Sequence, residues 1–137
     1  MHDAFVAELA RPSEPWRAAI HVDMDHFGSI NRGYNWQAAD KVLAEVAHLL
    51  GSMRSPRAFL ARVGGDKFLM LLLESVDAAA ERAENIRSLV ANLFANRFEG
   101  LTCSVSVVEA ATLGDTLTVL RELNVRAKAK RNYVASP

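Results

Sequence analysis

The stretch AFLARVGGDKFLMLLL, residues 58–73, decides how this chain folds. Two short apolar runs, 58–63 and 68–73, flank the polar tip Gly64-Gly65-Asp66-Lys67. Adjacent glycines permit a tight turn, and apolar runs of this length joined by such a turn predict a β-hairpin. The tip also lets a ligand approach the backbone closely, although many such tips are only turns.

Apolar patterns on both sides of this hairpin predict further strands and helices. Asn35 and Ser75 are the expected N-caps of two helices, and Gly51 is an expected C′ residue. Strands that alternate with helical crossovers around one hairpin predict an α/β fold with a single mixed sheet and flanking helices. The expected strands cover residues 18–22, ending at Asp23, and 101–108, and the expected helices cover 3–10, 36–51, 76–95 and 116–130.

Length and composition favour one domain over residues 1–137 in the cytoplasm. Sixteen Lys and Arg balance sixteen Asp and Glu, which argues against stable nucleic-acid binding because such binders carry a basic excess. The single cysteine excludes a disulfide framework within the chain. No apolar run reaches the ~18 residues of a membrane span, and the N-terminus has no signal-peptide pattern.

Two carboxylates, Asp23 and Asp25, follow the first strand, where open α/β sheets place ligands. Side chains alternate along an extended chain, and we expect only one of the two carboxylates to face any one site. If the hairpin lies beside this strand, Asp66 comes close to Asp23. Two carboxylates and a backbone carbonyl suit Mg²⁺ bound with triphosphate oxygens. Taken alone, the motif fits a solvated turn equally well.

Basic residues cluster at the end of the last helix and suit a phosphate clamp. The same cluster also complements the helix dipole and favours solubility, which is the simpler interpretation of it alone. The four histidines show no metal-ligand spacing, and His21 is expected to pack within its strand. Cys103 is expected to be a small core residue rather than a nucleophile. The basic cluster comprises Arg126, Lys128, Lys130 and Arg131.

Together these motifs resemble the GGDEF family, the diguanylate cyclases, in the same order along residues 4–132. The family pattern Asp-x-Asp-x-Phe-Lys-x-Ile-Asn matches DMDHFGSIN at residues 23–31. The signature hairpin matches GGDKF at residues 64–68, and the closing helix motif matches residues 126–132 with one residue fewer. Several motifs in the right order make the match specific, whereas Gly-Gly-Asp alone would not.

The resemblance implies a palm-like fold, similar to that of nucleotidyl polymerases and class III adenylate cyclases. Active members join two GTP molecules into cyclic di-GMP, with one GTP on each half of a homodimer. Asp66 and Lys67 occupy the signature positions with implied catalytic roles. By position, the resemblance implies that Mg²⁺, or Mn²⁺ in its place, would be bound by Asp23, the Met24 carbonyl and Asp66. Guanine would be bound by Asn31 and Asp40, and the phosphates by Lys128 and Arg131. The nucleotide would also lie against Phe27, Gly64 and Gly65.

Several residues depart from the family pattern. Lys67 stands where active members have Glu, which replaces a carboxylate near the metal by a cation. At a few ångströms, like charges oppose each other by several kcal/mol even at moderate effective dielectric. Gly28 replaces the phosphate-binding Lys, and Asn35-Trp36 replaces a Gly-His pair. Residues 55–58, SPRA, stand where the family carries its product-inhibition motif Arg-x-x-Asp.

These departures lead to three hypotheses. The first is a degenerate GGDEF domain of cyclic-dinucleotide signalling, which binds GTP and Mg²⁺ with weak or no cyclase activity and acts as a sensor or interaction module. The alternative is an active minimal palm-type cyclase that makes a cyclic dinucleotide, related to the polymerase palm of type III CRISPR effectors. The third is a structural domain that binds a protein partner and no ligand.

Overall fold

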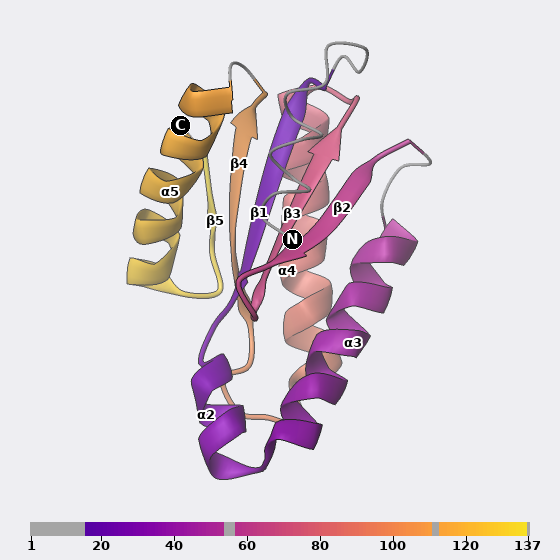
Figure 1. The fold of residues 1–137 in the computed structure, drawn as a ribbon, viewed down its shortest axis with the longest axis vertical. Helices are drawn as coiled ribbons and strands as arrows, with labels where there is room; N and C mark the ends of the chain where they lie inside the picture. The colour runs from indigo at the N-terminus through magenta and orange to yellow at the C-terminus, as the bar shows by residue number, and fades with distance from the viewer. Residues whose placement is uncertain (1–15, 54–56, 111–112, 137) are drawn as a thin grey trace.

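The computed structural model describes residues 16–53, 57–110 and 113–136, and one mixed sheet forms the centre of these segments (Figure 1). Neighbouring strands run antiparallel except β4 and β5, which run parallel. The predicted α/β fold with a single mixed sheet is therefore confirmed, although the parallel pair involves β5, which the sequence analysis missed. The strand order is β2 (Phe59–Val63), β3 (Lys67–Leu72), β1 (Ala18–Met24), β4 (Cys103–Glu109), β5 (Val134–Ala135).

Two helical connections pass over a strand instead of joining neighbours. From β1 the chain runs through α2 (Phe27–Gly33) and α3 (Trp36–Met53) to β2, and β3 lies between β1 and β2. Helix α4 (Val76–Phe94) likewise connects β3 to β4 across β1. This split βαβ arrangement puts β1 in the centre of the sheet, where all seven of its residues are buried.

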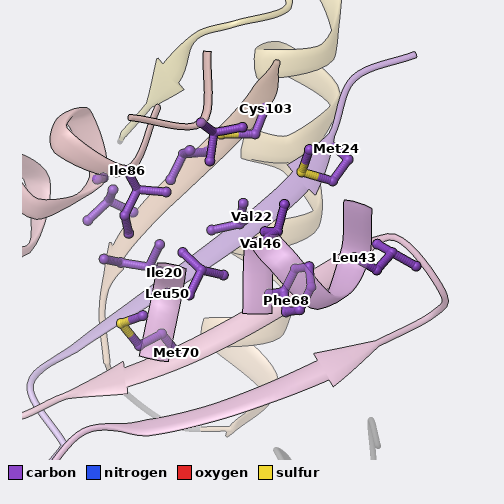
Figure 2. Close-up of a cluster of buried hydrophobic side chains, with 14 of the residues drawn as sticks. Ile20, Val22, Met24, Leu43, Val46, Leu50, Phe68, Met70, Ile86 and Cys103 are labelled. Atoms are coloured by element: carbon purple, nitrogen blue, oxygen red, sulfur yellow. The ribbon is translucent and has the colours of Figure 1, made fainter. Parts of the chain in front are cut away.

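Helices cover both faces of the sheet. Helices α3 and α4 pack on one face, and α5 (Leu113–Lys130) packs on the other (Figure 1). In the core below α3 and α4, each large apolar side chain contributes about 1.5–3 kcal/mol by leaving water. None of the helices in the described segments has the length and apolar character of a membrane span. Figure 2 shows this core, which includes Ile20, Val22, Met24, Val46, Leu50, Phe68, Met70 and Ile86.

Two predicted N-caps are confirmed, while several helix ends differ from the prediction. Asn35 Oδ1 accepts the Ala38 N–H at 2.8 Å, and Ser75 Oγ accepts the Ala78 N–H at 3.2 Å. The expected C′ role of Gly51 is wrong, because α3 continues through it to Met53. A glycine ends a helix only where the chain adopts the left-handed conformation, and the apolar face of α3 extends beyond Leu50.

The shortest elements and one helix start were not predicted. Helix α2 has seven residues and follows His26, whose φ of 59° turns the chain out of β1. Strand β5 has two residues, too few for a periodic pattern. Helix α5 begins at Leu113, three residues before the predicted start at residue 116. The helix expected over residues 3–10 lies outside the described residues.

One end of the sheet gathers segments that are far apart in the sequence (Figure 1). There the Met24 N–H donates to the Asp66 carbonyl at 3.1 Å, which joins the end of β1 to the β2–β3 turn. The Asp25 N–H donates to the Thr102 carbonyl at 2.8 Å, which joins the same segment to the start of β4. This end of the sheet therefore brings the predicted site residues Asp23, Met24 and Asp66 onto neighbouring strands.

Candidate functional site

The β2–β3 turn is shaped by its two glycines. Gly64 and Gly65 have φ values of 57° and 81°, in the left-handed region that side-chain-bearing residues rarely adopt. Arg62 Nε donates to the Gly65 carbonyl at 2.8 Å and holds the turn from one side. Lys67 Nζ lies 3.0 Å from Asp66 Oδ1, so the two signature residues with implied catalytic roles form an ion pair.

A cavity of about 400 Å³ lies between this turn and α3, and we call it the hairpin–α3 cavity. Five residues predicted to bind nucleotide or metal line it together, although they come from separate parts of the chain. The Trp36 side chain is 64% exposed and also lines it, which gives the cavity an aromatic wall. The lining comprises the predicted Phe27, Asp40, Gly64, Gly65 and Asp66, joined by Trp36, Ala39, Leu43 and Arg62.

Asp25 is fully buried beside the end of β1. Its carboxylate accepts hydrogen bonds from Ser104 Oγ at 2.6 Å, Thr102 Oγ1 at 2.7 Å, the Asn132 N–H at 2.7 Å and Lys128 Nζ at 2.9 Å. Burial opposes ionisation of Asp25, but these hydrogen bonds outweigh it and lower the pKa of the carboxyl. Asp25 is therefore an ionised anchor that ties β1 to β4 and to the end of α5.

Asp23 and Asp25 face the same side of the sheet, toward α5. Lys128 Nζ lies 3.3 Å from Asp23 Oδ1 and 2.9 Å from Asp25 Oδ1. The expectation that only one of the two carboxylates could face a given site is wrong, because residues two apart along a strand share a face. The Met24 side chain between them points the other way, into the core below α3 and α4.

The two predicted phosphate-binding residues contact carboxylates in this structure. Lys128 Nζ also donates to the Met24 carbonyl at 3.0 Å and to the Asp23 carbonyl at 3.2 Å. The Arg131 guanidinium lies 3.6 Å from Asp25 Oδ1 and remains half-exposed. Both cations thus sit at the end of β1, where the phosphates of a nucleotide in the hairpin–α3 cavity would have to compete with Asp25 for them.

The oxygens expected to hold Mg²⁺ are already bound by lysine ammonium groups. Lys128 contacts the Met24 carbonyl and Asp23, and Lys67 contacts Asp66. Together with Arg131, three cations balance the carboxylates of Asp23, Asp25 and Asp66. Within the described residues, no group of three or more His, Cys, Asp or Glu is placed to hold a metal ion. The donor set in this arrangement does not fit a divalent cation, which needs uncompensated oxygen ligands.

Other predicted site residues lie apart from the hairpin–α3 cavity or are not described. Asn31 belongs to α2, but its side chain lies outside the described part of the structure. Lys67 pairs with Asp23 across β1 and β3, and it lines a second cavity on the α5 face together with His21. Cys103 is confirmed as a core residue, since burial raises the pKa of its thiol to about 12.

Sequence reasoning missed several residues that hold the site together. Asn124 Nδ2 donates to Asp23 Oδ2 at 3.2 Å, and Thr102 and Ser104 both donate to Asp25. Asn124 lies four residues before Lys128, so helical spacing alone put it on the same face of α5. Thr102 and Ser104 carried no such signal, because their partner Asp25 is 77 and 79 residues away in sequence.

Known proteins resemble this chain in fold and in sequence. The family model "Diguanylate cyclase, GGDEF domain" matches residues 6–125, and the chain therefore belongs to the GGDEF domain family. Among solved structures, the GGDEF domain and coiled coil of DgcB from Caulobacter crescentus, in complex with c-di-GMP, superposes with a TM-score of 0.85. That match covers 98% of this chain and 80% of the DgcB chain at 26% sequence identity.

Curated relatives include one diguanylate cyclase and one probable diguanylate cyclase. Diguanylate cyclase DgcP of Pseudomonas aeruginosa is 33% identical over 90 residues, and probable diguanylate cyclase DgcT of Escherichia coli is 36% identical over 73 residues. These matches cover 63% and 53% of this chain. They cover only 13% of DgcP and 16% of DgcT, so the chain corresponds to a small part of each relative.

Proposed function

We propose that this chain is a GTP-binding GGDEF module with weak or no cyclase activity, which acts as a sensor or interaction module in cyclic-dinucleotide signalling. The observation that carries the proposal is the hairpin–α3 cavity, where Asp40 and the Gly64-Gly65 turn face each other. Its volume of about 400 Å³ falls within the range of small-molecule sites, roughly 300–1,000 Å³.

Asp40 supports a preference for guanine over adenine. A carboxylate accepts hydrogen bonds from both N1–H and N2–H₂ of guanine, whereas adenine offers no such donor pair. A site built on hydrogen bonds rejects a ligand that leaves its polar groups unpaired. The exposed indole of Trp36 on the cavity wall offers a stacking surface for the base.

The cationic residues around the signature support the part of the proposal that says cyclase activity is weak or absent. Attack of a ribose hydroxyl on an α-phosphate needs charge neutralisation and in-line positioning more than covalent participation by the protein. Bound Mg²⁺ or Mn²⁺ would supply that neutralisation, held by Asp23, the Met24 carbonyl and Asp66. Here those oxygens are engaged by Lys67 and Lys128, so a metal would first have to displace the lysines.

An active minimal cyclase is the second candidate, and one observation favours it. Asp23 and Asp66 are both present at the ends of neighbouring strands, which the Met24 N–H to Asp66 carbonyl bond holds together. If nucleotide phosphates draw Lys67 and Lys128 away from these carboxylates, the remaining oxygens suit a metal. In that case Lys67 becomes a phosphate contact of a working site.

A nucleotide titration with product analysis tests the proposal. We expect GTP to change the fluorescence of Trp36 at concentrations at least ten-fold below those needed for ATP, with little dependence on Mg²⁺. Trp36→Phe, which leaves Trp16 in place, should remove the signal but not binding measured by calorimetry. Asp40→Ala should weaken the binding of GTP far more than the binding of ATP.

Two results would count against the proposal in different ways. Equal affinity of the unmodified protein for ATP and GTP would contradict guanine recognition by Asp40. Robust formation of a cyclic dinucleotide in the presence of Mg²⁺ would instead establish the active cyclase. Binding of GTP without any product from GTP, ATP or their mixture is the outcome that the proposed module predicts.

A further inference from the structure

A second cavity, of about 310 Å³, lies between the sheet and α5, and we call it the α5 cavity. It lies on the opposite face of the sheet from the hairpin–α3 cavity, because Leu69 and Leu120 in its wall belong to the core below α5. Its volume is near the lower end of small-molecule sites, roughly 300–1,000 Å³, and suits a ligand of one or two rings.

Two buried polar atoms in the wall of this cavity have no hydrogen-bond partner among the described residues. They are His21 Nδ1 and Asn124 Oδ1. His21 is only 9% exposed, so little water can reach its imidazole. The Asn124 amide is oriented by its Nδ2 bond to Asp23, which leaves the oxygen as a free acceptor. A buried polar atom without a partner destabilises the fold until a ligand or water supplies one.

The charge at the cavity favours an anion. Arg121 lines the cavity, is exposed, and makes no ion pair within the described part of the chain. Lys67 also lines the cavity, but its ammonium is paired with Asp66 Oδ1 at 3.0 Å. Among the described residues that line the cavity there is no carboxylate side chain, so the charge of Arg121 favours an anionic ligand over a cationic one.

We propose that the α5 cavity binds a small planar aromatic acid that carries a ring N–H or hydroxyl group. The ring packs against Leu69 and Leu120, and the ring donor bonds to Asn124 Oδ1 or His21 Nδ1. The carboxylate pairs with Arg121 at the mouth. This proposal does not depend on the nucleotide site proposed above. Asp40 and Trp36 lie on the other face, although Gly64 of the turn lines both cavities.

Methyl NMR titrations of the full chain test this proposal with three matched probes. Indole-3-acetate has ring, N–H and carboxylate; 1-naphthaleneacetate lacks the N–H; indole-3-ethanol lacks the carboxylate. We expect indole-3-acetate to shift the methyl resonances of Leu69 and Leu120 saturably, with at least ten-fold higher affinity than either other probe. Asp40→Ala should leave this titration unchanged.

An arginine pair on α5 supplies the variant and its control. Arg121→Ala should weaken the binding of indole-3-acetate at least ten-fold and leave the binding of indole-3-ethanol unchanged. Because Arg121 is exposed, the variant should fold normally. Arg126→Ala removes an exposed arginine of the same helix that is outside the lining, and should change neither titration. Non-saturable shifts, equal affinity for all three probes, or equal losses in the two variants would overturn the proposal.

Discussion

Lys67 places a positive charge at the signature position where the resemblance to the family implies a glutamate. Its ammonium lies 3.0 Å from Asp66 Oδ1, and its backbone is paired with Asp23 in the β1–β3 register. Burial favours the neutral amine, but the hydrogen bond to Asp66 and the charges of Asp23 and Asp66 outweigh burial and raise its pKa. The side chain is therefore cationic at neutral pH and neutralises one of the expected metal ligands.

Replacing this lysine is the first prediction at the scale of a residue. Lys67→Glu removes the ion pair with Asp66 and changes the local charge by two units. In a degenerate cyclase the variant should bind Mg²⁺ more tightly and raise a very low GTP turnover, because a metal-binding carboxylate is restored. Turnover should stay below that of active members, because Gly28 lacks the phosphate-binding lysine. Cyclic dinucleotide formation and Mg²⁺ titrations measure both effects.

A neutral variant separates the loss of the cation from the gain of a ligand. Lys67→Met keeps the length of the side chain and should not raise turnover as Lys67→Glu does. Asp66→Asn in the Lys67→Glu background should remove the gain again. If the unmodified protein is active and Lys67→Glu lowers its activity, Lys67 belongs to a working site. The hypothesis of a degenerate cyclase is then wrong.

His21 gives a prediction on stability and pH. Burial lowers the pKa of its imidazole from the ordinary 6.5 to about 4, with Asp23 opposing this and Lys67 and Lys128 adding to it. The unfolded chain therefore takes up the proton first as the pH falls. The free energy of unfolding should decrease by about 3 kcal/mol between pH 6.5 and 4, and change no further through this group at lower pH. Urea unfolding across this range measures the slope.

His21→Leu isolates this contribution because it cannot titrate. The free energy of unfolding of this variant should depend little on pH between 6.5 and 4. It should still decrease at lower pH. The decrease at lower pH comes partly from Asp25, whose pKa is below its ordinary 3.8. The stabilisation by this carboxylate disappears only as it is protonated. An unchanged slope in His21→Leu would show that other groups cause the pH dependence.

At the scale of elements, Asp25 decides how α5 attaches to the sheet. Its carboxylate links the end of β1 to Thr102 and Ser104 of the β4 segment, and to Lys128 and the Asn132 N–H at the end of α5. A buried carboxylate of this kind is satisfied only when all these donors converge on it. Removing it leaves the same donors buried without an acceptor.

Asp25→Ala should therefore lower the free energy of unfolding by about 3–5 kcal/mol. Amide hydrogen exchange in α5 should increase more than exchange in α3, because α5 loses its attachment. Asp40→Ala is the matched control, since Asp40 is exposed on α3 and should change stability little. Equal losses in the two variants, or uniform exchange changes, would contradict an anchoring role.

At the scale of the whole molecule, the proposed function places one nucleotide in the hairpin–α3 cavity of each chain, whereas a cyclic dinucleotide is made from two nucleotides. The hairpin–α3 cavity, at about 400 Å³, is of a size that small-molecule sites commonly have. We predict that GTP shifts the protein from monomer to a homodimer whose hairpin–α3 cavities face each other. The formal net charge of zero means that no long-range repulsion opposes the association. Sedimentation velocity with and without GTP measures the shift.

Asp40→Ala should abolish this GTP-dependent shift at concentrations where the unmodified protein is saturated. ATP should produce no shift in either protein. A dimer of the same size with and without GTP would point to an interface that is independent of the nucleotide. A monomer at saturating GTP would exclude dimerisation across the cavity and leave the interaction role to another partner.

The strands and helices with long periodic patterns were predictable from the sequence alone. The hairpin at residues 58–73 follows from its glycines and flanking apolar runs, and the caps Asn35 and Ser75 follow from local hydrogen-bonding chemistry. These signals are local, so neighbouring residues contain all the information. The family motifs grouped Phe27, Asp40 and the signature glycines as nucleotide-binding residues, and the structure brings these residues to one cavity.

Only the tertiary structure decided which charges meet. Lys128 reaches the Met24 carbonyl from 104 residues away, and Lys67 turns to Asp66, so the expected metal ligands are neutralised by cations of the same chain. Sequence analysis identified each of these residues but not their pairing. Coulomb energy depends on the distance between side chains in space and on their burial, and both are set by strand order and helix packing rather than by spacing along the chain.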